Sequence, residues 1–291
     1  MVFRWPPLRR GFKITVVLPS SSLSIYPTLR EKTEFIGRVS RSLAVFRVEK
    51  VVVVSDSRDS DLFVTILRYL QLAPYLRRKL VPLSKELQYV GVLPPLNIAT
   101  HNPEGAPPRE GMLRDGLVEV SWGLKGRVFI GERRRCIAES RQTLSPGERV
   151  LVRIVKEDPL RCKVEDPAGV REYVGYQTIS VDIGKSFGVD VRGSLSVVTS
   201  KNGKSFSKGL ARKLWGDILR GKAITLYFGN HEKDFDEILQ DEGFEVAGAF
   251  DYKINFIPDQ GTLTVRSDEA LISVLAALDT SSRLVSRGSK T

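Results

Sequence analysis

The sequence predicts an α/β protein whose chain is interrupted near its middle by a small β-barrel. Near both ends, apolar segments of strand length alternate with amphipathic segments of helix length, as in a parallel sheet covered by helices. Between them, short β-rich segments are separated by glycine, proline and aspartate, a pattern typical of a small barrel or sandwich. We therefore expect a discontinuous α/β domain at residues 1–100 and 179–291, and a barrel domain at 101–178.

Two strand–helix pairs open the chain. Residues 13–18 form an apolar run, and residues 51–54 are four consecutive valines. A continuous β-branched run is typical of a parallel strand that is buried on both faces. The helical spacing of apolar residues after each of these strands predicts helices at 29–45 and 61–70.

Six short β segments follow a hinge in the middle of the chain. Pro94 and Pro95, together with the Pro- and Gly-rich residues 102–108, mark the domain boundary. Regular short strands predict an OB-like barrel, a fold that often binds single-stranded nucleic acid. The open alternative is an insert that only spaces or dimerises the protein. The six segments are residues 117–122, 127–130, 135–138, 149–155, 161–164 and 170–173.

The C-terminal third returns to the alternation of strands and helices. Turn formers at 258–261 lead into a short β-rich segment at 262–265. Ser267 can cap the apolar-faced helix that follows, because serine side chains accept hydrogen bonds from the first helical turn. Before these elements we expect strands at 194–198, 223–228 and 244–250, and helices at 210–219 and 234–241.

The composition indicates a folded protein with no membrane partner. Hydrophobic residues make up 42% of the 291 residues and charged residues 27%, and the longest apolar runs have the length of a strand. The basic N-terminus lacks an apolar signal core, so we expect a cytoplasmic protein. The two cysteines, Cys136 and Cys162, predict a reducing compartment, small buried side chains and no metal site.

The net charge of +11 is concentrated in the first third of the chain. Residues 1–100 carry 16 Lys and Arg against 7 Asp and Glu, whereas residues 179–291 carry 15 of each. A concentrated basic excess attracts polyanions, so we expect RNA as the partner, with an ordinary solvated basic surface as the alternative. The expected RNA contacts are Arg38, Arg77, Arg78, Lys79, Arg127, Arg133, Arg134 and Arg135, with Trp122 as an aromatic candidate.

Two C-terminal motifs resemble those of a known family. Residues 226–232 read LYFGNHE, in which Phe228 and Gly229 end a strand, and residues 255–278 read NFIPDQGTLTVRSDEALISVLAAL. The Phe-Gly strand end and the later P-x-Q-G-x-x-x-V-R segment are similar to the two halves of the cofactor pocket in the knotted methyltransferases of the SPOUT superfamily. Residues 14–280 resemble in particular its archaeal and eukaryotic branch of RNA methyltransferases with an OB-like insert.

The resemblance implies a fold, a cofactor and a site. It implies a trefoil-knotted parallel-sheet domain that binds S-adenosylmethionine, and a homodimer with the active site at the subunit interface. Gly37 and Arg41 are similar to the N-terminal motif of the superfamily, so Arg41 is the expected catalytic residue and would reach the partner subunit's site. The expected cofactor-binding residues are Thr199, Ser200, Gly229, Asn230, Asn255, Phe256, Ile257, Gly261 and Leu263.

The implied function is methylation of ribosomal RNA, with uridine N3 as the favoured atom and a ribose 2′-hydroxyl as the runner-up. Loss of the N3 proton requires a general base or an environment that stabilises the anion. His231 is a candidate base, although a histidine in a loop is more often only solvated. Two other classes of function stay open: a non-catalytic RNA-binding dimer that keeps the knot as a scaffold, and an OB-type nucleic-acid module joined to an unrelated α/β domain.

Overall fold

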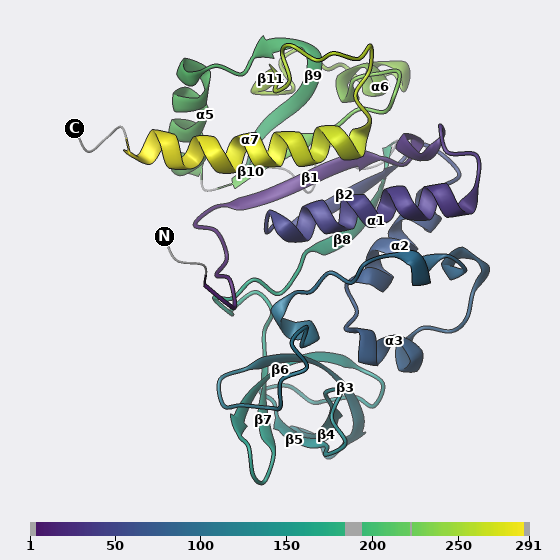
Figure 1. Cartoon of the computed structure of the whole chain (residues 1–291), viewed down its shortest axis with the longest axis vertical. Helices are drawn as coiled ribbons and strands as arrows, with labels where there is room; N and C mark the ends of the chain where they lie inside the picture. Colours follow the sequence, from purple (N-terminus) through teal and green to yellow (C-terminus); the bar gives the residue numbers. More distant parts are fainter. Residues whose placement is uncertain (1–3, 184–193, 222, 288–291) are drawn as a thin grey trace. The chain divides into compact units, whose positions relative to one another are not determined.

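The computed structural model describes residues 4–183, 194–221 and 223–287, and it divides into two compact units (Figure 1). The sheet unit comprises Arg10–Leu67, Glu86–Pro94 and Tyr176–Thr291. The barrel unit comprises Met1–Arg9, Arg68–Lys85 and Pro95–Gly175. The barrel unit thus takes in residues 1–9 and 68–85, which the sequence places with the α/β domain.

The sheet unit is built on six parallel strands in the order β11-β9-β10-β1-β2-β8. Because every neighbouring pair is parallel, the carboxyl ends of all six strands lie at the same edge of the sheet. The predicted strands at 13–18, 51–54, 194–198 and 223–228 are confirmed. The strands are β1 (Lys13–Pro19), β2 (Lys50–Ser55), β8 (Gln177–Asp182), β9 (Leu195–Ser205), β10 (Ala223–Tyr227) and β11 (Tyr252–Asn255).

Helices follow the strands as predicted, and one of them is fixed by a capping box. At the start of α1 (Leu29–Val45), the Thr28 hydroxyl accepts a hydrogen bond from the Glu31 amide at 3.2 Å, and the Glu31 carboxylate accepts one from the Thr28 amide at 3.0 Å. The other helices are α2 (Ser60–Leu70), α5 (Lys208–Gly221), α6 (Phe235–Asp241) and α7 (Ser267–Arg287), with a 3₁₀ turn, η1 (Ser20–Leu23), after β1.

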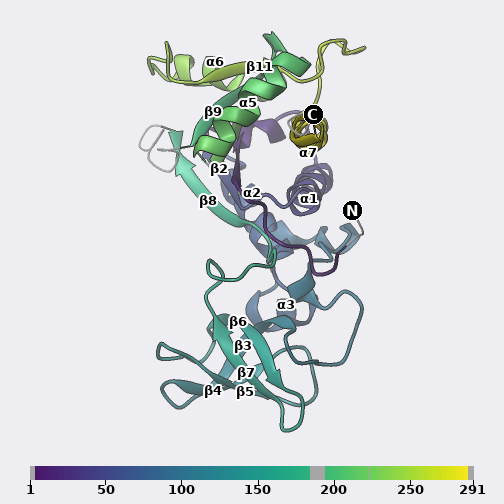
Figure 2. The same cartoon turned by 90° about the vertical axis from the view of Figure 1, so that its left-hand side faces the viewer.

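Helix α7 packs against α1 and α5, and α1 and α7 run side by side (Figure 2). Two side-chain contacts fix its position. The Trp215 indole donates a hydrogen bond to the Ser281 hydroxyl at 2.9 Å, and Arg10 forms an ion pair with Asp279 at 2.8 Å. Each contact joins α7 to a segment that lies far from it in the sequence, so the C-terminal helix is an integral part of the sheet unit.

Both faces of the sheet are buried. Val16, Val51 and Leu226 are fully buried on one face, and their chain neighbours point to the other because side chains alternate along a strand. The predicted four-valine strand is therefore covered on both sides. The second face packs against α6 in one cluster that contains Val17, Val52, Val54, Ile183, Val198, Tyr227, Phe235, Ile238 and Leu239.

Two predicted β segments in the C-terminal third are wrong. Residues 244–250 are irregular apart from a turn at 247–248, and residues 262–265 are also irregular. Phe244, Val246 and Phe250 explain the first error, because they pack on the cluster beside α6 through their side chains without backbone pairing. In the second segment Leu263 is 86% exposed, so its apolar side chain gains no strand partner and no core.

The barrel unit contains a closed five-stranded barrel in the order β3-β4-β5-β7-β6. The β5–β7 pair is parallel and the other pairs are antiparallel. The predicted strand at 170–173 is wrong, since a single bridge between Leu8 and Glu172 is formed there. The strands are β3 (Leu113–Ser121), β4 (Lys125–Phe129), β5 (Cys136–Glu139), β6 (Arg149–Lys156) and β7 (Arg161–Glu165), with helix α3 (Pro74–Leu80) and the 3₁₀ turn η4 (Ala99–His101) in the same unit.

The two cysteines lie in the core of this barrel. Cys136 of β5 and Cys162 of β7 are buried, as predicted, and they form a disulfide that closes a 26-residue separation. The disulfide differs from the predicted reducing compartment, in which thiols stay unpaired. It was not predicted because two cysteines at this distance in the sequence give no sign that their strands are neighbours. Within the described ranges, no helix has both the length and the apolarity needed to cross a membrane.

A buried polar network joins η4 and the start of α3 to β3. Asp115 of β3 accepts hydrogen bonds from Arg149 at 2.7 Å and from the Ala73 amide at 3.3 Å. Next to it, His101 is 4% exposed, and its Nε2 atom donates to the Gln71 carbonyl at 3.0 Å. Burial lowers the pKa of His101 to about 4, against the opposing effect of Asp115, because a charged imidazole would lose its hydration.

This network predicts a loss of stability on acidification. The unfolded chain takes up a proton on His101 below about pH 6.5, whereas the folded state excludes that proton until about pH 4. The contribution is therefore fully present above about pH 6.5 and falls by on the order of 3 kcal/mol as the pH drops to about 4. Urea unfolding at four pH values measures this change in the free energy of unfolding. His101→Gln keeps an amide donor but cannot titrate, so an unchanged pH dependence in this variant would refute the assignment.

Candidate functional site

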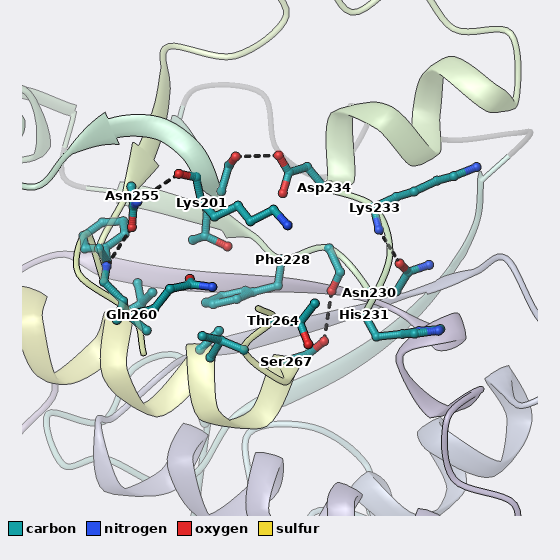
Figure 3. A pocket seen from close by; sticks show the side chains of 18 of the residues that line it. Lys201, Phe228, Asn230, His231, Lys233, Asp234, Asn255, Gln260, Thr264 and Ser267 are labelled. Carbon is teal, nitrogen blue, oxygen red and sulfur yellow. Dashed lines mark hydrogen bonds between the residues drawn. The ribbon is translucent and has the colours of Figure 1, made fainter. Parts of the chain in front are cut away.

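A pocket lies at the carboxyl edge of the sheet, where three chain segments meet (Figure 3). The segments are residues 199–201 of β9, residues 228–234 after β10 and residues 255–257 at the end of β11. The parallel order places β10, β9 and β11 side by side. Residues 199–201 directly follow the part of β9 that pairs with β10, so the three segments are neighbours. The start of α7 closes the pocket with Ser267, Ala270 and Val274.

The structure brings most of the predicted cofactor residues together around this pocket. Two others, Gly261 and Leu263, do not line it, and their neighbours Gln260 and Thr264 do. The side-chain amide of Gln260 donates hydrogen bonds to the carbonyls of Thr262 and Leu263, which fixes the conformation of the loop at 260–263. The predicted residues that line the pocket are Thr199, Ser200, Gly229, Asn230, Asn255, Phe256 and Ile257.

The loop after β10 is held in shape by Asn230. The Asn230 side-chain oxygen accepts hydrogen bonds from the backbone amides of Glu232 at 2.9 Å and Lys233 at 2.8 Å. The backbone amide of Asn230 donates to the Lys233 carbonyl at 3.0 Å. Ser267, predicted as a helix cap, instead donates its hydroxyl to the Gly229 carbonyl at 3.0 Å. The loop and the first residue of α7 therefore hold each other in place.

A chain of hydrogen bonds extends from this loop to the ends of β1 and β2. The Asn230 amide group donates to the Ser21 hydroxyl at 3.0 Å, and Ser21 donates in turn to the Asp56 carboxylate. Asp56 also accepts from the Ser20 hydroxyl and from the Ser21 amide, each at 2.8 Å. These residues were not predicted as part of the site. Their signal in the sequence is the run of small polar residues directly after two buried strands.

Glycine is required sterically at Gly229. A Cβ atom there would overlap the Lys233 carbonyl oxygen and lie 2.8 Å from Asp234 Cα. Gly203 is similar, because a Cβ would lie 2.7 Å from the backbone of Ile254, where β9 and β11 pair. Gly261 differs from both, since a Cβ there would meet no atom within 4 Å. The two glycines of the family motif therefore have different structural roles.

Two carboxylates beside the pocket share one lysine. Ser200 donates its hydroxyl to Asp234, and the Lys253 ammonium pairs with Asp234 at 3.1 Å and with Asp236 at 2.7 Å. Burial alone would lower the pKa of Lys253, but the hydrogen bonds to the two carboxylates raise it above its usual range. Lys253 therefore stays charged at neutral pH and offsets one of the two negative charges that it contacts.

His231 and two arginines of α1 are not part of the hydrogen-bond chain formed by Asn230, Ser21 and Asp56. His231 lines the pocket and contacts Ser24 at 3.4 Å and Glu232 at 3.3 Å. Arg38 donates to Asp268, in the first turn of α7, at 2.6 Å. Arg41 is half-buried on α1 and is not among the residues that line the pocket.

The basic residues predicted to contact RNA in the barrel unit differ in their contacts and in their exposure. Arg77 and Arg135 have contacts within the unit: Arg77 donates to the Leu70 and Leu72 carbonyls, and Arg135 pairs with Glu119 at 2.7 Å. Lys79 and Arg134 also form ion pairs, with Glu119 and Asp158. The exposed members of the predicted set in this unit are Arg78, Lys79, Arg127, Arg133 and Arg134.

The described residues contain no cluster of three or more His, Cys, Asp or Glu side chains suited to hold a metal ion. The polar groups that line the pocket include amides and hydroxyls, such as those of Asn255, Gln260 and Thr264. The charged or ionisable side chains of the lining are Lys201, His231, Glu232, Lys233 and Asp234. Phe228, Ile257 and Val274 supply its apolar wall. A pocket of this chemistry is suited to an organic ligand that has both a flat apolar part and hydrogen-bonding groups.

The contrast between the two motif glycines gives a matched pair of variants. Gly229→Ala should lower the melting temperature by about 3–10 °C, because the added methyl group overlaps backbone that cannot move freely. Gly261→Ala should leave the melting temperature within about 1 °C of the wild type. Thermal unfolding followed by circular dichroism measures both. Equal melting temperatures for the two variants would contradict the close approach at Gly229.

Comparison with known proteins gives the family. The family model described as "Putative RNA methyltransferase" matches residues 13–278. Uncharacterized proteins of Haloarcula marismortui and Halobacterium salinarum are each 30% identical to the chain, over 91% of it and 98% of their own length. A 28S rRNA (uridine-N(3))-methyltransferase of Mus musculus is 25% identical over 92% of the chain and 76% of its own length. The chain therefore belongs to this SPOUT-type family of RNA methyltransferases.

Proposed function

We propose that the protein transfers a methyl group from S-adenosylmethionine to N3 of a uridine in ribosomal RNA. The observation that carries this proposal is the pocket itself, where the motif residues of three separate segments meet at one edge of a parallel sheet. The substrate and the atom come from the mouse relative, whose name specifies uridine N3 of 28S rRNA and which aligns with 92% of the chain.

The pocket fits the cofactor in its chemistry. S-adenosylmethionine supplies an activated methyl group on a sulfonium and carries an adenine ring but no phosphate, so a phosphate-binding glycine loop is not needed. Phe228, Ile257 and Val274 provide apolar surface for the ring. The side-chain amides of Asn255 and Gln260 add hydrogen-bonding groups at the same wall.

The proposed mechanism depends mainly on positioning. The residues at the strand ends orient the reacting groups, because alignment supplies much of the rate of such a displacement. The N3 proton must also leave, and Arg41 of the partner subunit would stabilise the resulting anion or hold a neighbouring phosphate. The proposal therefore includes a homodimer. It also includes the knotted chain path and an OB-like barrel, which the parallel strand order and the five-stranded barrel order support.

The cofactor and the methylated atom can be tested in sequence. Calorimetric titration with S-adenosylmethionine and S-adenosylhomocysteine should show one saturable site per subunit. Ribosomal RNA incubated with protein and cofactor should then stop reverse transcription at one uridine, because a methyl group on N3 blocks the Watson–Crick edge. A ribose 2′-O-methyl mark leaves that edge free. Absence of cofactor binding to the folded protein, with RNA binding intact, would favour the scaffold function over catalysis.

The role of Arg41 gives a second prediction. Arg41→Ala should retain cofactor binding and reduce methylation by about 100-fold or more, which is typical for loss of a group that stabilises developing charge. Arg30→Ala is the matched control, since Arg30 lies on the same helix, is exposed and pairs only locally with Glu34. Retained turnover in Arg41→Ala would remove it from the site.

A complementation experiment tests whether Arg41 acts across the dimer. Gly229→Val should fail to bind cofactor but keep its own Arg41, whereas Arg41→Ala keeps its pocket. Mixed dimers of the two variants should regain methylation that neither homodimer has, because one pocket is then paired with one intact arginine. If the mixture remains inactive while mixed dimers form, Arg41 does not act on the partner subunit's pocket.

A further inference from the structure

We infer that one outer face of the barrel binds single-stranded RNA. We define this barrel face by six exposed residues: Trp122, Lys125, Arg127, Ile137, Arg161 and Lys163. They belong to β4, β5 and β7 and to the turn between β3 and β4. This inference deepens the proposed function, because it assigns a binding surface for the RNA substrate on a part of the chain distinct from the pocket.

The strand register places these side chains in two rows. Arg127 of β4 is opposite Ile137 of β5, which is opposite Arg161 of β7. In the second row Lys125 is opposite Glu139, which is opposite Lys163. Paired residues in a sheet project from the same side, and the residues between the two rows, Gly126, Ala138 and Cys162, are buried on the core side of the barrel.

Trp122 extends the second row. Its amide donates to the Lys125 carbonyl at 2.7 Å across the turn formed by Gly123 and Leu124, so Trp122 and Lys125 are a cross-strand pair. The turn is fixed by its neighbours, because the Leu144 amide donates to the Gly123 carbonyl at 2.9 Å and the Ser140 amide to the Leu124 carbonyl at 2.8 Å. The exposed indole is therefore held on a rigid part of the chain.

Positive charge predominates on the barrel face. Four cations surround one carboxylate, Glu139, which pairs with Lys125 at 2.8 Å. The hydrogen bond from Lys125, and further the charge of Arg161, hold the pKa of Glu139 below its usual range, so it stays ionised. One carboxylate cannot neutralise four cations, and the excess positive charge favours a polyanion over a neutral partner.

The apolar members of the face select a single strand. Trp122 is 59% exposed and Ile137 is 38% exposed, and both are large side chains that a folded protein usually buries. Aromatic side chains next to cations are the combination on which unpaired bases stack while phosphates are held alongside. In a duplex the bases are stacked on one another, so an exposed indole would find only the backbone. The outer side of the second and third strands is also the surface that five-stranded OB barrels use for oligonucleotides.

The neighbouring arginine cluster at 133–135 is a weaker candidate for the same role. Arg135 is half-buried, pairs with Glu119 and packs its guanidinium over the Phe129 ring at 4.7 Å. Arg134 pairs with Asp158. The sequence draws attention to this triplet because the three arginines are consecutive, whereas the barrel face is assembled from residues up to 41 positions apart, between Trp122 and Lys163.

The test is RNA binding by variants of the full chain. Fluorescence anisotropy with a labelled single-stranded oligouridine should show that Trp122→Ala weakens binding about 5- to 100-fold, as expected for loss of one stacked base. Arg161→Ala should weaken binding and reduce the slope of log K against log salt by about 0.7, which corresponds to one lost phosphate contact. A duplex of the same length should bind no more tightly than the single strand and should be insensitive to Trp122→Ala.

A matched control and two outcomes make the test decisive. Arg212→Ala removes the same charge from an exposed position on α5 and should change neither the affinity nor the salt slope. Unchanged single-strand affinity in both folded barrel-face variants would overturn the inference. Equal losses for duplex and single strand in Trp122→Ala would overturn the single-strand assignment.

The proposed function and this inference can fail separately. If the wild type methylates ribosomal RNA but the barrel-face variants bind single-stranded RNA normally, the inference fails and the proposed function stands. If the wild type binds no S-adenosylmethionine but the variants lose single-strand binding, the proposed function fails and the barrel face stands. Calorimetry with the cofactor alone separates the two cases, because it needs no RNA.

Discussion

Parallel pairing of the strands is the constraint on which the site depends. The order β11-β9-β10-β1-β2 brings five carboxyl ends to one edge, although the strands that supply them are scattered from Lys13 to Asn255 along the chain. In an antiparallel sheet, alternate ends would point away from one another and the same residues could not meet. The pocket is therefore a consequence of strand direction first and of individual side chains second.

Close backbone packing turns this edge into a defined pocket. Gly229 allows the loop after β10 to fold onto its own backbone, and the Ser267 hydroxyl fastens the first residue of α7 to that loop. The Asp56–Ser21–Asn230 hydrogen bonds then connect the same loop to the ends of β1 and β2. A ligand bound there would meet backbone already held in position, so little conformational entropy would be lost on binding.

The sequence predicts the strands of the sheet for a physical reason, whereas most of the pocket lining was predicted from the resemblance to the SPOUT superfamily. Buried parallel strands need continuous β-branched runs, and the four valines of β2 are such a run. The sequence does not predict where β9 ends. Gly203 is typical of a turn, but in the structure this glycine lets β9 continue against β11. An irregular segment whose apolar side chains pack on the core, as Phe244 does, has the same apolar pattern in the sequence as a strand. Small polar residues after β1 and β2 mark Ser21 and Asp56 in the sequence, but only the tertiary structure brings them into contact.

The distribution of charge shows why net charge alone does not locate an RNA surface. The basic excess lies in the first 100 residues, yet Arg10, Lys32 and Arg38 there form ion pairs with Asp279, Asp59 and Asp268 and so support the fold. The barrel region has little net charge, but strand register gathers four of its cations on one face and places an exposed indole beside them. What a polyanion meets is the local arrangement of charge, because screening in salt limits each charge to a range of about 10 Å. A rigid pocket and an exposed cationic face are therefore separate requirements, and this chain meets them in different units.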